Sequence, residues 1–186
     1  MKKLFVIAVL LFMVAATTSA QKYFTKSGKI NFDATAQNST EIIEAVNRSV
    51  VCVVDSKTGA MQFSVLMKGF EFERALMQEH FNENYVESEK FPNTIFKGQI
   101  ANSEKINYSK DGTYPVSVKG KLTIHGETKE VVAEGKLIVQ NGKITTNTVF
   151  SIELKDYKIS IPGVVANQIS KTVTIHVACL LELLKN

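Results

Sequence analysis

The segment from Tyr114 to Ile144 constrains the fold more than any other part of the sequence. Apolar residues recur at every second position from Val116 to Ile124 and again from Val131 to Val139. This alternation is typical of β-strands with one face in water and one face buried. His125-Gly126 separates the two runs, and Asn141-Gly142 closes the second with a dipeptide that favours tight hairpins because both residues tolerate positive φ. The segment therefore predicts an antiparallel meander whose apolar face must be buried.

The rest of the chain extends this pattern. Further strands are expected at Gly28–Ala34, Ser49–Asp55, Met61–Lys68, Thr94–Ile100, Lys143–Leu154 and Ile169–Leu184. N-cap candidates at 38–41 precede the apolar segment 42–47 and predict a short helix there. A second, amphipathic helix is expected within Glu71–Asn84. About eight strands with little helix and no alternation of strands and helices indicate an all-β domain.

Antiparallel strands with one shared apolar face form either a closed barrel or a sandwich of two sheets. Gly98, Gly120 and Gly135 lie on the apolar faces of long expected strands. Glycine inside a strand permits a bend or makes room for another group. These positions favour a sheet that curls into a closed antiparallel barrel. Its interior can be filled by side chains or can hold one small ligand, and alternation alone leaves both open.

The first twenty residues have the composition of a secretory signal peptide. Met1-Lys2-Lys3 is basic, 4–16 is almost wholly apolar, and small residues precede Gln21. We therefore expect a signal peptide at 1–20, one domain at 21–186, and a periplasmic or secreted protein with no stable membrane span after cleavage. Lys2 and Lys3 leave with the signal, so the charge falls from +4 to about +2. The basic residues are scattered, and no nucleic-acid partner is expected.

Cysteines and histidines suggest no catalytic centre. Cys52 and Cys179 lie in apolar runs, and the sequence leaves open whether they are buried thiols or a disulfide. His80, His125 and His176 have no His or Cys partner at ligand spacing, so no metal site is predicted. No nucleophile elbow occurs, and we expect neither enzyme activity nor a cofactor. For His80 and His125, a hydrogen-bonding role at a barrel mouth and a structural role in a turn or cap remain alternatives.

Several segments together resemble the YceI family. They are M-Q-E-H-F-N-E-N-Y-V-E-S-E-K-F-P-N-T-I-F-K-G at 77–98, G-K-L-T-I-H-G-E-T-K at 120–129 and D-Y-K-I-S-I-P at 156–162. The resemblance runs from about Gly28 to Leu184. It implies a lipocalin-like barrel, exported to the periplasm, with an elongated apolar pocket for a polyisoprenoid or similar lipid that is bound without being transformed. The helix expected before Ser49 and the segment Met77–Tyr85 depart from the family pattern and leave the ligand open.

We therefore expect an exported carrier of an apolar or amphipathic small molecule, such as an isoprenoid-like lipid. The expected wall residues are Phe63, Val65, Met67, Phe96, Val118, Leu122, Leu137, Phe150, Ile152, Val173, Ile175 and Val177. Tyr85 and Phe91 either form a lid over one barrel end or plug it. The alternative function is a stress or interaction module with a packed interior that acts through its outer surface. A homodimer is compatible with either function.

Overall fold

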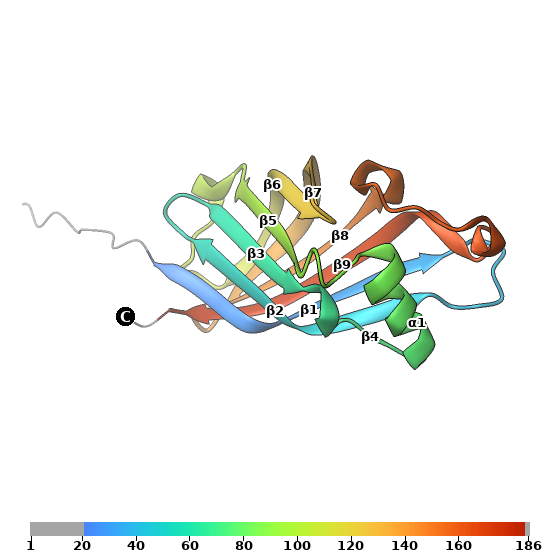
Figure 1. Cartoon of the computed structure of the whole chain (residues 1–186). Coiled ribbons are helices and arrows are strands. Elements are labelled where there is room, and N and C mark those ends of the chain that lie inside the picture. The colour runs from blue at the N-terminus through green and yellow to red at the C-terminus, as the bar shows by residue number, and fades with distance from the viewer. Residues whose placement is uncertain (1–20, 185–186) are drawn as a thin grey trace, which may run out of the picture.

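The computed structural model describes residues 21–184, so the predicted signal peptide lies outside the described residues. Eight long strands form a closed antiparallel barrel (Figure 1). They are β1 (Lys22–Thr35), β2 (Glu44–Asp55), β3 (Ala60–Leu66), β5 (Asn93–Ile100), β6 (Gly112–Ile124), β7 (Glu127–Gln140), β8 (Lys143–Glu153) and β9 (Ile169–Leu183). The neighbour order is β1-β9-β8-β7-β6-β5-β3-β2, and β1 also pairs with β2, which closes the ring. The predicted all-β barrel is confirmed.

The two predicted tight turns determine the register of the β6–β7–β8 meander. Ile124 pairs with Glu127 and Gln140 pairs with Lys143, so each hairpin has a two-residue loop. Both residues of each loop have positive φ, at 49° and 78° for His125-Gly126 and 50° and 73° for Asn141-Gly142. Such turns match the natural twist of the flanking strands. They direct the alternating apolar residues of this meander into the barrel.

Two of the predicted strand glycines provide space for an aromatic ring. Gly98 on β5 lies opposite Gly120 on β6. A Cβ added at either position would lie 2.4 Å or 2.6 Å, respectively, from Cζ of Phe96. The Phe96 ring therefore lies across the glycine pair, which only residues without a side chain allow.

The helix predicted at 42–47 is wrong, because residues 44–47 belong to β2 and residues 42 and 43 precede it without helical structure. Ala45 pairs with Phe32 on one side and with Phe72 of the short strand β4 (Glu71–Phe72) on the other. The hydroxyl of Ser39, a predicted cap, instead donates to the carbonyl oxygen of Glu41 and accepts from its N–H, at 2.8 and 3.0 Å. Pairing to strands on both sides supplies the backbone hydrogen bonds that a helix would otherwise have made.

The second predicted helix forms over part of its range. Helix α1 spans Ala75–His80 and continues into a π-helical turn at Phe81–Tyr85. The first residues of the predicted range, Glu71–Phe72, form β4 instead. A short 3-10 helix, Met67–Gly69, connects β3 to β4.

Aromatic packing fills the barrel end that holds the start of β1. The Tyr23 and Tyr108 rings stack with their centroids 5.7 Å apart. Tyr108 comes from the connection between β5 and β6, and burial raises its pKa to about 12. Ile144 and Leu181, which are fully buried, belong to the same end of β8 and β9. This end is a packed core rather than an opening.

The two cysteines meet above β1. Cys52 on β2 and Cys179 on β9 are free thiols, both buried, and they share a hydrogen bond. That hydrogen bond, together with burial, raises the pKa of Cys52. Gly28 of β1 lies beneath them, since a Cβ there would be 2.6 Å from Cys179 Sγ. The absence of a side chain at Gly28 is what allows thiols from two non-adjacent strands to touch.

Gly28→Ala is expected to lower the free energy of unfolding by about 1–3 kcal/mol, because its methyl group overpacks a full core. Urea denaturation would measure this. Gly163→Ala is the control, because a Cβ there meets nothing within 4 Å. Combining Gly28→Ala with Cys179→Ala should recover part of the loss. Equal stability of the wild type and Gly28→Ala would contradict the packing described here.

Candidate functional site

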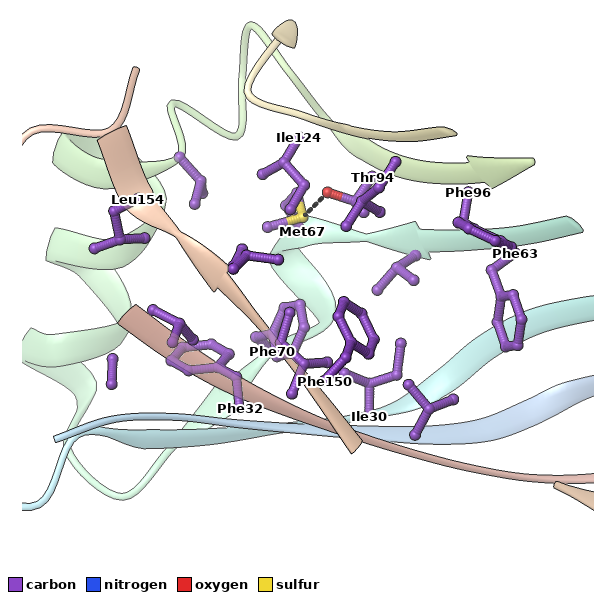
Figure 2. A pocket seen from close by; sticks show the side chains of 18 of the residues that line it. Ile30, Phe32, Phe63, Met67, Phe70, Thr94, Phe96, Ile124, Phe150 and Leu154 are labelled. Carbon is purple, nitrogen blue, oxygen red and sulfur yellow. Dashed lines mark hydrogen bonds between the residues drawn. The ribbon is translucent and has the colours of Figure 1, made fainter. Parts of the chain in front are cut away.

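The barrel encloses a cavity of about 530 Å³ whose wall is almost entirely apolar (Figure 2). Small-molecule sites typically occupy about 300–1,000 Å³. All twelve residues expected on the wall line it: Phe63, Val65, Met67, Phe96, Val118, Leu122, Leu137, Phe150, Ile152, Val173, Ile175 and Val177. The structure thus brings together side chains from β3, β5, β6, β7, β8 and β9. That they contact a ligand stays a prediction.

Sequence reasoning missed an aromatic group on the wall, made by Phe32, Phe70, Phe72 and Phe81. Phe32 has the inward parity of the predicted first strand, so its alternation could have identified it. Phe70 and Phe81 lie on a loop and at a helix end, where no strand period applies. Their placement depends on the path of the chain between β3 and β5.

These aromatic side chains attach the helical segment to the barrel. The Phe81 ring, which follows α1, lies 5.5 Å from Phe32 of β1 and 5.1 Å from Phe72 of β4, measured between centroids. Phe70 lies 5.6 Å from Phe81, edge to face. Aromatic pairs in this range stabilise by about 0.5–1.5 kcal/mol beyond the area they bury. Phe81 therefore holds the helical segment against one side of the cavity.

Polar residues appear on the wall where the cavity reaches the surface. Arg74, Leu76, His80 and Gln168 are solvent-exposed and also line the cavity, so the cavity opens at this end. Arg74 pairs with Glu41 from the β1–β2 loop, which joins that loop to the start of α1. The opening can accommodate a polar head group while the interior takes an apolar tail.

Inside the cavity, polar contacts are sparse. Thr94 on β5 donates its hydroxyl to Sδ of Met67 at 3.1 Å (Figure 2). Thr146 and Thr148 of β8 also line the cavity. The Thr148 hydroxyl is satisfied by donating to the carbonyl oxygen of Glu134 at 2.6 Å.

The strand pairing of the barrel wall stops part-way along β7 and β8. Within the described chain, pairing of these strands runs from Gln140–Lys143 to Gly135–Thr148 and stops there. Beyond this point, β7 continues to its start at Glu127 paired with β6, and β8 continues paired with β9. Gly135 and Thr148, at the last pair, both line the cavity. We call the stretch beyond this pair the β7–β8 seam; it is a part of the wall without strand-to-strand pairing.

His125 joins three connections at the barrel end. One ring nitrogen, Nδ1, lies 3.0 Å from the carbonyl oxygen of Tyr157, and Nε2 lies 2.6 Å from a carboxylate oxygen of Glu87. The Phe91 ring packs edge to face on the imidazole at 4.8 Å. His125 therefore has the structural role in a turn that was one alternative, and it fills this role by hydrogen-bonding to two other connections; it is not among the residues that line the cavity.

The other two histidines, His80 and His176, lie apart from His125 and its hydrogen-bond partners. His80 is exposed on α1 beside the opening, and His176 faces outward on β9. Among residues 21–184, no group of three or more His, Cys, Asp or Glu side chains is placed to hold a metal ion. The expectation that no metal is bound stays a prediction.

Tyr85 and Phe91, the expected lid or plug, have separate places. Tyr85 lines the cavity at the end of the π-helical turn and is half-buried. Phe91 contacts His125 and lies against Gly126, where a Cβ would be 2.7 Å from the ring. Of the pair, Tyr85 belongs to the cavity wall and Phe91 supports the β6–β7 turn.

Comparison with known proteins identifies the family. The sequence profile of the YceI-like domain matches residues 8–180. The chain belongs to this family. Among curated proteins, none matches the sequence.

Solved structures share the fold of this YceI-like chain at low identity. A polyisoprenoid binding domain from Saccharophagus degradans aligns with a TM-score of 0.76 and 11% identity, covering 89% of this chain and 100% of that domain. BcnA from Burkholderia cenocepacia gives 0.66 and 15%, covering 83% and 95%. The YceI protein of Campylobacter jejuni gives 0.54 and 16%, covering 74% and 81%. Within the described part of this YceI-like chain, no helix is both long and apolar enough to cross a membrane.

Replacing His125 by Asn is expected to lower the free energy of unfolding by about 1–3 kcal/mol, because it leaves Glu87 and the Tyr157 carbonyl without their imidazole partner. Asn tolerates positive φ, so the substitution tests the ring rather than the turn. Denaturant titration would measure the loss, with the exposed His176→Asn as control. A stable His125→Asn protein would show that the imidazole contributes little to holding these connections.

Proposed function

We propose that this YceI-like protein binds one apolar or amphipathic small molecule, a lipid or isoprenoid-like compound, and carries or sequesters it in an aqueous compartment outside the cytoplasm. The observation that supports this most directly is the apolar cavity of about 530 Å³. The Saccharophagus degradans neighbour, a polyisoprenoid binding domain, supports the same ligand class. The composition of residues 1–20 supports export.

Desolvation supplies the binding free energy in this proposal. Removing roughly 300 Å² of apolar surface from water at about 25 cal/mol per Å² gives about 7 kcal/mol before the costs of association. The wall offers few hydrogen-bonding groups, so it selects for apolarity and shape. A polar head group would lie at the opening near Arg74, His80 and Gln168, where charge stays hydrated.

The proposed binding involves no catalytic step. Three threonines are the polar residues lining the interior; the other polar lining residues are the exposed Lys136 and Asn147 on β7 and β8 and the group at the opening, Glu41, Arg74, His80 and Gln168. The alternative of a packed barrel that acts through its outer surface does not fit the volume of the interior. The ligand is therefore expected to leave the protein chemically unchanged.

Native mass spectrometry and organic extraction of protein purified without detergent test the proposal. The expected result is a lipid at about one molecule per chain, together with saturable binding of the fluorescent fatty acid cis-parinaric acid. A clean extract combined with no uptake of this probe would reject the carrier function.

Phe150→Asp is expected to abolish uptake of cis-parinaric acid, since it places a carboxylate on the cavity wall. Val149→Asp is the matched control, because this neighbouring side chain on the same strand is 54% exposed and faces outward. Phe63→Asp should act like Phe150→Asp.

Val118→Trp provides a second variant that occupies part of the cavity without burying a charge and should weaken uptake about tenfold. Circular dichroism establishes that each variant is folded. Full uptake by folded Phe150→Asp and Val118→Trp proteins would show that the cavity is not the binding site.

A further inference from the structure

The most exposed large apolar side chains of residues 21–184 gather at the open end of the cavity. They are Val164, Ile42 and Leu76, which are 93%, 66% and 61% exposed. Leu76 lines the opening itself, and the neighbours Ile43 and Val165 line it beside the other two. Exposed apolar residues scattered singly are ordinary, but their concentration around one opening indicates a contact surface.

These side chains come from segments that are held together. The loop between β1 and β2 is joined to the segment before β9 by a hydrogen bond from Ala36 N to the Gln168 carbonyl, at 3.0 Å. The Glu41–Arg74 ion pair joins the same loop to α1. Figure 1 shows the three segments at one end of the barrel. We call Ile42, Leu76 and Val164 the apolar rim.

The loops that carry the rim hold little charge. Residues 36–40 and 159–170 contain no Asp, Glu, Lys or Arg, in a chain whose charged residues make up 22%. Beside the rim in the sequence, charge comes from Glu41 next to Ile42 and from Glu73, Arg74 and Glu79 around Leu76. Arg74, beside Leu76, is already paired with Glu41. These two loops offer no charge to a polyanionic or polycationic partner, and around Leu76 the one basic residue is already paired, so the rim fits an apolar environment that carries no net charge.

We infer that the apolar rim docks on the surface of a lipid bilayer, so that the guest passes between bilayer and cavity without crossing water. This inference rests on the proposed function, because a bilayer is where an apolar guest would be stored. Apolar side chains of surface-bound proteins insert about 5–10 Å into the interfacial region. Docking at the opening would keep the apolar tail of the guest out of water during transfer.

The form of the rim favours a bilayer over a second protein surface. A stable protein interface buries about 800 Å² on each partner with close complementarity. The rim instead offers separate projecting side chains around an opening that must stay accessible. A fluid head-group layer can surround such projections, whereas a folded surface would need a matching pocket for each.

A tryptophan reporter tests insertion directly, because the chain contains no Trp. Val164→Trp is expected to shift its fluorescence emission to the blue when phosphatidylcholine vesicles are added, and lipids with brominated acyl chains should quench it. Val132→Trp is the matched control, since Val132 is 58% exposed on the outer wall. The control emission should not change. Identical behaviour of the two reporters would overturn the inference.

A pair of double variants tests the rim without altering the cavity. Ile42 and Val164 do not line the cavity, so Ile42→Ser combined with Val164→Ser should leave the equilibrium affinity for dispersed cis-parinaric acid unchanged. It should lower partitioning onto phosphatidylcholine vesicles and the rate of probe transfer from vesicles by about tenfold. The control combines Val132→Ser with Leu180→Ser, both on the outer wall, and should match the wild type. Partitioning should be the same at low and high salt, since no charge attraction is involved.

The outcomes separate this inference from the proposed function. Absence of any uptake of dispersed probe by the wild type would reject the carrier function, whatever the vesicle result. If both double variants take up dispersed probe normally and partition equally onto vesicles, bilayer docking by the rim is rejected while the carrier function stands. A dimer in sedimentation experiments that the rim substitutions dissociate would assign the rim to self-association and overturn bilayer docking.

Discussion

The pairing of β1 with both β2 and β9 is the interaction on which the rest of the structure depends. It turns an open sheet into a ring, in which every long strand pairs with a neighbour on each side over at least part of its length. Closure also fixes which face is interior, because alternate residues of every strand must point inward once the ring is formed. The apolar cavity and the packed end at Tyr23 and Tyr108 both follow from this ring.

The interior contains two kinds of packing. Near the start of β1, buried thiols, aliphatic side chains and stacked tyrosines leave no room for a guest. Beyond this packed end, the cavity wall is lined by partly buried phenylalanines, including Phe63, Phe96 and Phe150. Large side chains there line a space instead of meeting across it. The division accounts for a fold that is held together at one end and opens at the other.

Much of this arrangement was predictable from alternation. The apolar parity of β6 to β9 predicted which residues face inward, and the turn residues at His125-Gly126 and Asn141-Gly142 predicted the register. All the wall residues inferred from strands line the cavity. Whether the interior was hollow could not be predicted, because a packed core uses the same residue types.

The features of the fold and the site that alternation does not predict depend on contacts between segments distant in the sequence. The segment at 42–47 has local features of a helix, yet Ala45 lies between two strand partners that only the folded chain brings to it. Phe70 and Phe81 line the cavity from irregular segments whose direction no sequence period gives. The partners of His125, Glu87 and the Tyr157 carbonyl, lie 38 and 32 residues away along the chain.

The β7–β8 seam has a mechanical consequence. Inter-strand hydrogen bonds resist stretching of a barrel around its circumference, and beyond Gly135–Thr148 this resistance is missing between one pair of neighbours. The seam is therefore a line along which the wall resists widening less. In the proposed carrier, a guest somewhat wider than the resting cavity would be admitted by widening of the barrel at the seam, which relaxes the selection by shape and leaves the selection by apolarity in place.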